Sequence, residues 1–232
     1  MPRAETLPPW KLVHSADEIQ PDPHHILIAS HNCESLYPHI QEISQNQLFQ
    51  KADSITLQET WTHQNVTIHS PLANHTLILQ HRQQQDNEQH SYNKGGVGLL
   101  FHQDFEYTVI DTSALQIECI AIKISAPPLT IVNIYRPPTY NLNAFCEELS
   151  AFSTQLEDPI IMIGDFNVKY LSASNNMLSR TLSEYQQLIS TPTTRKRTLI
   201  DHIYVKNAKI VHAGVMPTSY SYHDATFVFL AS

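Results

Sequence analysis

Three things are scarce in this sequence: cysteine, cationic side chains and long apolar runs. Only three cysteines occur in 232 residues, and Cys33, Cys119 and Cys146 have no paired spacing, which predicts reduced thiols in an intracellular protein, nuclear or cytoplasmic. No apolar run approaches the length of a membrane span. Residues 1–22 are polar and proline-rich and lack the apolar segment of a secretory signal. The sequence therefore predicts neither secretion nor a membrane partner.

Acidic side chains outnumber cationic ones: the chain has 14 Lys and Arg and 22 Asp and Glu, which gives a formal net charge of −8. Proteins that bind nucleic acids usually present a basic face, so the total argues against such a partner. It does not exclude one, because the local field decides binding and metal-binding carboxylates lower the total. The one basic cluster, Arg195, Lys196 and Arg197, precedes Asp201 on a predicted loop. Two interpretations are open for it: a solvated loop or a phosphate contact.

The apolar residues make up 41% of the chain, which excludes a disordered protein and suffices for one α/β domain. We find no internal repeat and no linker between domains. We expect residues 1–25 to form a flexible N-terminal leader and residues 26–232 to form the domain. The glycines at 95, 96 and 98 precede an apolar run instead of opening a helix, so they are not a dinucleotide-binding fingerprint.

The most informative stretch covers residues 160–167. Its first four residues are apolar, which indicates a buried strand, and Gly164 follows them. Asp165 and Asn167 come next, and residues two apart on extended backbone point to the same side. In α/β sheets, ligands bind at the carboxyl ends of strands. We therefore expect both side chains to face one cleft; the alternative is a turn, because Gly, Asp and Asn also form turns.

Other strand-like runs border polar residues that suit the same chemistry. In chain order these residues are Asn32, Glu59, Tyr135 with Arg136, Asp201 and His223. Carboxylate and amide oxygens suit Mg²⁺ or Mn²⁺ and do not suit zinc. Together with Asp165 and Asn167, the set predicts hydrolysis of a phosphodiester with the help of a hard divalent metal.

At these residues the chain resembles the endonuclease/exonuclease/phosphatase superfamily, and within it the apurinic-endonuclease-like endonuclease domain of LINE-type (non-LTR) retrotransposons. The sequence motifs typical of that branch are Asn-Ile-Tyr-Arg-Pro-Pro at 133–138, Gly-Asp-Phe-Asn at 164–167 and Ile-Asp-His-Ile at 200–203. The resemblance covers nearly the whole chain. It implies a four-layer α/β sandwich, in which two packed mixed β-sheets are flanked by helices and the site lies at one edge.

Periodicity and residue type predict where the elements lie. Helices, the second capped by Asn141, are predicted over 36–49, 142–152 and 177–188. After an exposed excursion over 80–94, strands are predicted over 95–101, 105–110 and 116–124. Three later strands are expected to close a second sheet, over 203–205, 209–215 and 226–230.

The resemblance also implies a role for each site residue. Glu59 would hold the metal, with Asn32 as a ligand or as an amide that orients one. Asp165 would align or deprotonate the attacking water, and Asn167 would donate to a phosphate oxygen. Tyr135 would place its phenol against the phosphate or the leaving oxygen.

Asp201 and His223 would form a dyad, in which the carboxylate fixes the tautomer of the imidazole. His223 then acts as a general base or as a charge-stabilising donor, and both roles are open. Phosphate contacts are expected from cationic and small polar residues: Arg136, Arg195, Lys196, Arg197, Thr193 and Thr198. For Arg136 the alternative is a surface salt bridge, and for the two threonines it is turn chemistry after Pro192.

One position departs from the family pattern, which usually has Ser-Asp-His before the last strand. Here the residues are Ser221, Tyr222, His223 and Asp224, so the acidic residue before the histidine is missing. Asp224 points the same way as position 222 on extended backbone, which makes it a candidate metal ligand. The alternative is a carboxylate at the strand entry with no role.

Three functions are compatible with these features. The first is a Mg²⁺-dependent endonuclease that nicks target DNA, and in a retrotransposon the resulting 3′ hydroxyl would prime reverse transcription. Its partner would be a reverse transcriptase domain in a longer polyprotein, and the isolated domain would be a monomer. The second is a phosphoesterase of the same fold acting on RNA, an inositol phosphate or a phospholipid. The third is a catalytically weakened relative that binds nucleic acid or a protein. The motifs at 133–138 and 200–203 favour the first.

Overall fold

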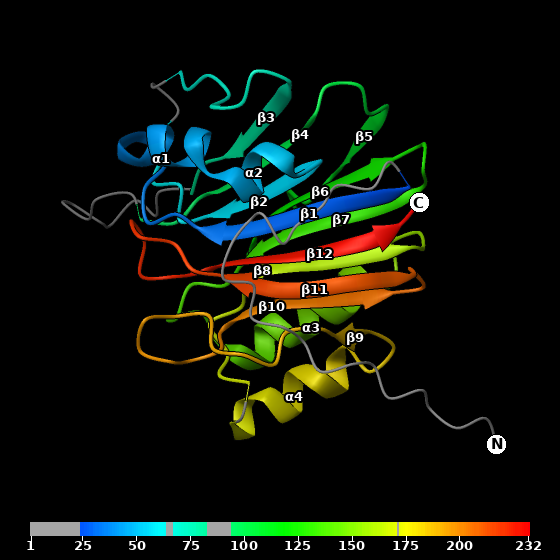
Figure 1. The fold of residues 1–232 in the computed structure, drawn as a ribbon. Helices are drawn as coiled ribbons and strands as arrows, with labels where there is room; N and C mark the ends of the chain where they lie inside the picture. The colour runs from blue at the N-terminus through cyan, green and yellow to red at the C-terminus, as the bar shows by residue number, and fades with distance from the viewer. Residues whose placement is uncertain (1–23, 64–66, 83–93, 171) are drawn as a thin grey trace.

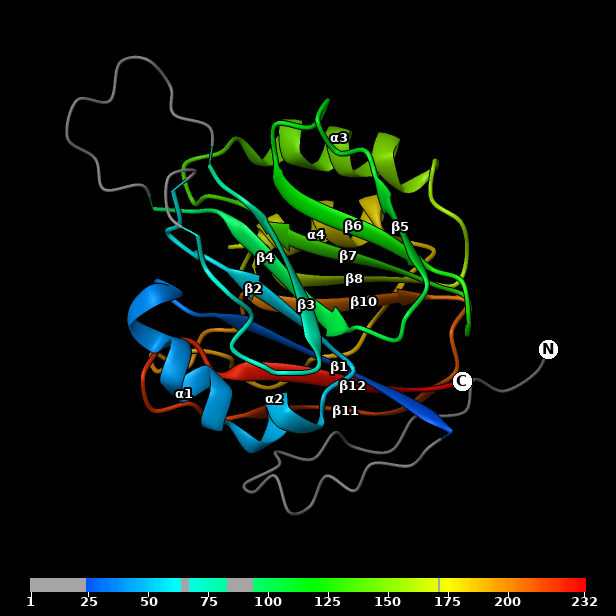
Figure 2. The same cartoon turned by 90° about the horizontal axis from the view of Figure 1, so that it is seen from above.

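Two six-stranded sheets pack face to face, with helices on the outer face of each (Figures 1 and 2). The structure, a computed structural model, describes residues 24–63, 67–82, 94–170 and 172–232. The four-layer α/β sandwich implied by the resemblance is confirmed. The leader predicted over 1–25 and the excursion predicted over 80–94 lie mostly outside the described residues. Among those residues, no helix is long and apolar enough to cross a membrane.

The first sheet joins strands from the two ends of the chain. Its order is β11 (Ile210–Met216), β12 (Ala225–Ala231), β1 (His25–Asn32), β2 (Ser54–Gln58), β4 (Val97–His102) and β3 (His75–Gln80). The central strands β1 and β2 are parallel, and the other neighbours pair antiparallel. Both parallel strands therefore end at the same edge of the sheet.

The second sheet is built from the middle of the chain. Its order is β5 (Tyr107–Ile110), β6 (Glu118–Ile124), β7 (Leu129–Tyr135), β8 (Ile160–Asp165), β10 (Asp201–Lys206) and β9 (Gln186–Gln187). The central strands β7 and β8 are again parallel, and the other neighbours pair antiparallel. Their carboxyl ends carry Tyr135 and Asp165, which are Cα partners in the register.

The central strands are apolar on both faces because each sheet is covered by the other sheet on one face and by helices on the opposite face. In β1, Ile26 and Ile28 pack into the core between the sheets, whereas Leu27 and Ala29 belong to the core that contains Leu48 and Phe49 of the outer helix layer. This alternation follows from the two-residue period of a strand. Burial on both faces explains why the sequence shows continuous apolar runs here.

Short helices cover the first sheet and longer ones the second. The former are the 3₁₀ helix η2 (Tyr37–His39), α1 (Ile40–Gln45) and α2 (Gln47–Lys51); the latter are α3 (Leu142–Ser153) and α4 (Ala173–Thr181). The helix predicted over 36–49 is interrupted at Asn46, whose side chain accepts the Leu48 and Phe49 amides and so caps α2. Asn141 caps α3 as predicted.

Two predictions about elements were wrong. The helix predicted over 177–188 ends at Thr181, and Gln186–Gln187 pair with β10 instead, because a long-range strand contact overrides local periodicity. The three late strands do not close one sheet: β10 joins β8, whereas β11 and β12 join β1. An apolar run shows that a strand is buried, but it does not show which neighbour it pairs with.

A buried polar bridge joins the two sheets close to the edge that carries Asp165. The Asn133 side chain of β7 donates to the carbonyls of Leu57 and Gly98 at 2.9 and 2.8 Å. The Gln58 amide of β2 donates in turn to Asn133 Oδ1 at 2.7 Å. Buried amides require such partners, so this bridge fixes how the ends of β2 and β7 face each other.

Candidate active site

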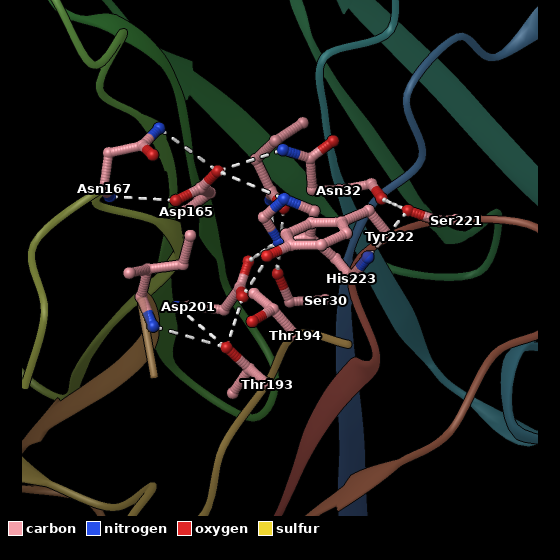
Figure 3. A network of polar contacts seen from close by, with 12 residues as sticks. Ser30, Asn32, Asp165, Asn167, Thr193, Thr194, Asp201, Ser221, Tyr222 and His223 are labelled. Carbon is pink, nitrogen blue, oxygen red and sulfur yellow. Dashed lines mark hydrogen bonds and ion pairs between the residues drawn. The ribbon is translucent and has the colours of Figure 1, made fainter. Parts of the chain in front are cut away.

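Residues from both sheets meet at one edge of the sandwich (Figure 3). Asn32 ends β1 and Asp165 ends β8, while Asp201 begins β10 and His223 lies two residues before β12. The pairing of β8 with β10 places Asp201 directly opposite Asp165. An isolated bridge between Thr194 and His223 joins the loop before β12 to the segment that precedes β10 of the second sheet. Segments far apart in the chain thus converge on one small volume.

His223 and Asp201 form a buried hydrogen-bonded pair. The Nδ1 atom of His223 lies 3.0 Å from both carboxylate oxygens of Asp201. The Thr193 hydroxyl donates to Asp201 Oδ2, and its oxygen accepts the amides of Ile200 and Asp201 at 3.3 Å. Thr193 therefore supports the carboxylate of Asp201, and its predicted phosphate contact stays a prediction.

Asp165 lies on the other side of the histidine and accepts several hydrogen bonds. Its Oδ2 atom is 4.0 Å from His223 Nε2 and accepts the Asn32 side-chain amide at 3.0 Å. Its Oδ1 atom accepts the Asn167 backbone amide at 2.8 Å. Asp165 is 1% exposed, so this carboxylate is held in place before any substrate arrives.

Gly164 allows the close approach of strands just before Asp165. It has a φ of +143°, and a Cβ atom at this position would lie 2.1 Å from the Ile134 carbonyl oxygen. A residue with a side chain would push β8 away from β7 and move Asp165 with it.

Asn167 reaches Asp165 through a turn. The prediction that the two side chains share one side because the backbone is extended was therefore wrong. Its φ is +50°, a left-handed conformation that asparagine tolerates better than most residues. Its side chain donates to Asp165 Oδ2 at 3.3 Å and to the Arg136 carbonyl at 2.9 Å. The two predicted neighbours are together, but the turn holds them.

Glu59 lies beside this group and is only half-buried. Its Oε1 atom accepts the Asn32 side-chain amide at 3.2 Å, and its Oε2 atom accepts the Trp61 indole N–H at 3.0 Å. Asn32 therefore bridges the carboxylates of Glu59 and Asp165. Tyr135 is also near: burial, and then the charges of Glu59 and Asp165, raise the pKa of its phenol, which keeps it a hydrogen-bond donor.

Glu34 is a site residue that the sequence reasoning missed. Its carboxylate accepts the Tyr222 backbone amide at 2.6 Å and the Ser221 hydroxyl at 3.2 Å, and its own amide donates to Asn32 Oδ1 at 3.2 Å. The signal was present, because Glu34 follows Asn32 with one residue between them, as Asn167 follows Asp165. Trp61 was missed too, although it comes two residues after Glu59.

The predicted phosphate-binding residues separate into two groups. Arg136 is buried, and its guanidinium donates to the carbonyls of Phe166, Asn167 and Tyr140, so the alternative of a surface salt bridge was wrong. Its contacts support the turn that carries Asn167. The Thr198 hydroxyl is paired with that of Thr194 at 2.6 Å, which is turn chemistry.

The basic loop is exposed beside the site. Arg195 donates to the Ser219 carbonyl at 2.6 Å, and Lys196 lies over the Tyr222 ring. Arg197 has a φ of +60° and is exposed. Asp224 accepts the Thr218 amide at 3.2 Å, so metal ligation by Asp224 remains a prediction without a supporting contact.

Charge interactions shift the proton affinities of the central residues. Burial lowers the pKa of His223, but the carboxylates of Asp201 and Asp165 outweigh it and raise the pKa to about 9. Burial, together with the Asp201 charge, raises the pKa of Asp165. The histidine is therefore cationic at neutral pH, and Asp165 titrates much closer to neutrality than an exposed aspartate.

The donor set fits a hard divalent ion. The side chains of Asp165, Asp201 and His223 lie within 4.8 Å of one another, but they are already hydrogen-bonded or ion-paired. Glu59 and Glu34 flank Asn32, and each offers a half-buried carboxylate. Carboxylate oxygens of this kind suit Mg²⁺ or Mn²⁺, so Glu59 and Glu34 are further candidate ligands beside the acidic group, and their carboxylates too accept hydrogen bonds here.

The chain belongs to the Endonuclease/Exonuclease/phosphatase family, whose model matches residues 29–223. The matched range contains the strand ends described above and stops at His223. The fold and the buried acid–histidine group thus define a phosphodiesterase-type hydrolase. No curated protein sequence matched the chain.

Several solved structures share the fold at low sequence identity. The endonuclease domain of TRAS1, a telomere-specific non-LTR retrotransposon, has a TM-score of 0.70 and 14% identity over 89% of this chain and 98% of that chain. The AP endonuclease LMAP from Leishmania major has a TM-score of 0.71 and 11% identity, covering 96% and 92%. The 3′-5′ exonuclease NExo from Neisseria meningitidis has a TM-score of 0.67 and 15% identity, covering 89% and 100%.

Proposed function

We propose that this chain is a metal-dependent DNA endonuclease that hydrolyses a phosphodiester bond in one strand and so nicks its target. The observation that carries the proposal is the contact between the Asp201–His223 pair and Asp165, with Nε2 of His223 4.0 Å from Asp165 Oδ2. A phosphate between these groups would meet a cation, a carboxylate and two amides. Such a set can both activate a water and stabilise the developing charge.

Each residue has a part in this reaction. Asp165, with its pKa raised, would orient the attacking water and accept its proton, because a general base works best when its pKa is near the operating pH. His223, which is cationic, would donate from Nε2 to a phosphate oxygen, and Asp201 would accept from Nδ1 and so orient and stabilise the imidazolium. Asn167 and Tyr135 would donate to the phosphate or the leaving oxygen.

Glu59 and Glu34 would hold Mg²⁺ or Mn²⁺, with Asn32 positioned between them. When bound, the ion neutralises phosphate charge and so helps the leaving oxygen depart. Arg195, Lys196 and Arg197 would contact the phosphates of the substrate strand, because this loop is exposed next to His223. Their positive charge would then lie beside the substrate, which would reconcile DNA binding with the acidic total.

The retrotransposon setting is the finer part of the proposal. It is supported by the motifs at 133–138 and 200–203 and by the similarity in fold to the TRAS1 domain. In that setting the nick would prime reverse transcription by a partner domain of a longer polyprotein, and the present domain would act as a monomer inside the cell.

The test is nicking of supercoiled plasmid DNA by the wild type and by Asp165→Asn, with Mg²⁺, with Mn²⁺ and with EDTA. We expect the wild type to nick only with metal, and the variant to lose at least about 10²-fold of that rate. Hydrolysis of an inositol phosphate or a phospholipid without nicking would refute the choice of substrate. Retained DNA binding with no hydrolysis of any ester would indicate a catalytically weakened relative.

A further inference from the structure

Tyr222 is held rigidly at the side of the catalytic histidine. Its backbone amide donates to Glu34 Oε2 at 2.6 Å, and its carbonyl accepts the Arg195 amide at 3.1 Å. Its ring centroid lies 5.4 Å from that of His223, in an edge-on arrangement. The side chain is only half-buried, so part of its ring is exposed, and Figure 3 shows the ring beside His223.

A lysine accompanies this ring. The Lys196 ammonium lies 5.8 Å from the centre of the Tyr222 ring, and the residue is exposed. A cation over an exposed ring is held weakly, because water competes for the charge. Lys196 can therefore leave the ring for a phosphate while the ring itself stays in place.

The same combination occurs at Glu59. The Trp61 indole N–H donates to Glu59 Oε2 at 3.0 Å, and the exposed Lys94 ammonium lies 5.2 Å from the indole ring centre. Trp61 is half-buried. A φ of +49° at Trp61 and a φ of +50° at Glu59 show that this turn adopts an uncommon conformation that directs both side chains to the site.

The two aromatic–lysine pairs are linked through the site itself. Trp61 contacts Glu59, Glu59 contacts Asn32, and Asn32 contacts Asp165. Asp165 lies against His223, whose ring neighbours that of Tyr222. The two rings are thus joined by one continuous set of contacts that includes Asp165 and His223.

We propose that Tyr222 and Trp61 stack on bases of an unpaired DNA segment, with Lys196 and Lys94 on its phosphates. This proposal rests on the proposed function and defines its substrate as a single-stranded or locally opened site. Aromatic rings bind bases of any sequence when the base faces are free. In an intact duplex those faces are covered by neighbouring base pairs, so a continuous duplex cannot use these rings. The tyrosine at position 222 is thus a specificity residue.

Binding can be measured without hydrolysis, by fluorescence anisotropy in EDTA. The probes are a short labelled DNA strand and the same strand annealed to its complement. We expect the wild type to bind the single strand about tenfold more tightly, and Tyr222→Leu and Trp61→Leu each to weaken that binding about fivefold or more. Tyr222→Phe keeps the ring and should bind as the wild type does. Lys196→Ala should weaken binding and flatten its salt dependence.

Matched controls are Tyr107→Leu and Lys123→Ala, which alter an exposed tyrosine and a partly exposed lysine on β5 and β6, in the second sheet. They should leave the affinity unchanged. Equal wild-type affinity for the single strand and the duplex, or wild-type affinity in Tyr222→Leu, would overturn the inference.

Cleavage of the same two probes with Mg²⁺ separates this inference from the proposed function. Metal-dependent cutting of both probes at the same rate would leave the endonuclease proposal intact and overturn the role of the rings. Ring-dependent binding of the single strand without any cutting would support the role of the rings and refute the endonuclease proposal.

Discussion

The two sheets of this protein share one pairing plan but supply different chemistry. In each sheet a central parallel pair, β1 with β2 or β7 with β8, has two antiparallel strands on either side. In each, helices connect the parallel strands. The carboxyl ends of both pairs meet at the site, so each half contributes polar residues from equivalent places.

The contributions differ in their exposure to water. From the second sheet come Asp165 and Asp201, which are 1% and 3% exposed; burial, together with the Asp201 charge, raises the pKa of Asp165. From the first sheet come Glu59 and Glu34, which are half-buried and bonded by neutral donors. The buried half is suited to moving protons, and the open half is suited to a metal that exchanges with solvent.

The largest expected effect is on the buried half, at Asp201. Replacing Asp201 with asparagine should lower kcat about 10²–10⁴-fold, because the imidazolium of His223 loses the carboxylate that orients and stabilises it. Asp201 raises the pKa of His223, so the variant should also lose its protonated histidine at a lower pH. The alkaline limb of the kcat–pH profile should therefore move toward acid.

The exposed Asp111→Asn is the matched control for this change, and it should leave both kcat and the profile unaltered. An Asp201→Asn enzyme with the wild-type alkaline limb would mean that His223 does not act as a cation.

A smaller effect is expected on the open half, at Glu59. Glu59→Gln should raise the Mg²⁺ concentration for half-maximal rate at least about tenfold, since even outer partners of metal ligands contribute about 10–100-fold. Excess metal should restore part of the rate, which it should not do for Asp201→Asn. Titration of the rate with Mg²⁺ measures this, with the exposed Glu106→Gln as control. An unchanged Mg²⁺ requirement in Glu59→Gln would contradict the proposal that residues from the first sheet hold the metal.

The smallest effect compares two buried histidines, one in each sheet. His202 of β10 bonds the Val168 carbonyl at 2.8 Å and the Gln187 amide at 3.2 Å, whereas neither ring nitrogen of His31 in β1 has a hydrogen-bond partner. His202→Phe should therefore cost about 1–3 kcal/mol of unfolding free energy at neutral pH. His31→Phe should cost less than about 1 kcal/mol, because it removes no such bond.

Both histidines should make the wild type sensitive to acid. Burial lowers the pKa of His31 to about 3 and of His202 to about 4. As pH falls below the ordinary value the unfolded chain binds these protons and the folded chain does not, so stability falls. The unfolding free energy should fall between about pH 7 and about pH 5, and each phenylalanine variant should make this fall smaller by ~2 kcal/mol. Urea unfolding at the two pH values tests this, and equal losses in wild type and variants would contradict it.

Local signals in the sequence were sufficient for much of the site. Strand ends are recognisable because an apolar run stops at a polar residue, and this located Asn32 and Asp165. Asp201 was found by the same rule, but it begins its strand, β10, and the run before it at 198–200 is not a strand. Neighbours on the folded surface were harder. Glu34 touches Tyr222 across 188 positions of chain, and no local pattern reveals such a contact.

Arg136 shows most clearly that the sequence alone does not predict the environment of a side chain. A cation after a strand suggests a phosphate ligand or a surface ion pair, yet it is buried on three carbonyls. Whether a side chain meets solvent depends on what packs over it, and for Arg136 that is the turn at residues 166–167 together with Tyr140.

By itself, the sequence determined the buried strands, the polar residues at their ends and the family, because these depend on residue type and short spacing. The tertiary structure alone decided which strands pair, and hence that Asp165 and Asp201 lie opposite each other beside His223. It also decided that Tyr222 and Trp61 stand beside the catalytic group with lysines over their rings. Those outcomes depend on packing between distant segments, where burial and charge act through space and not along the chain.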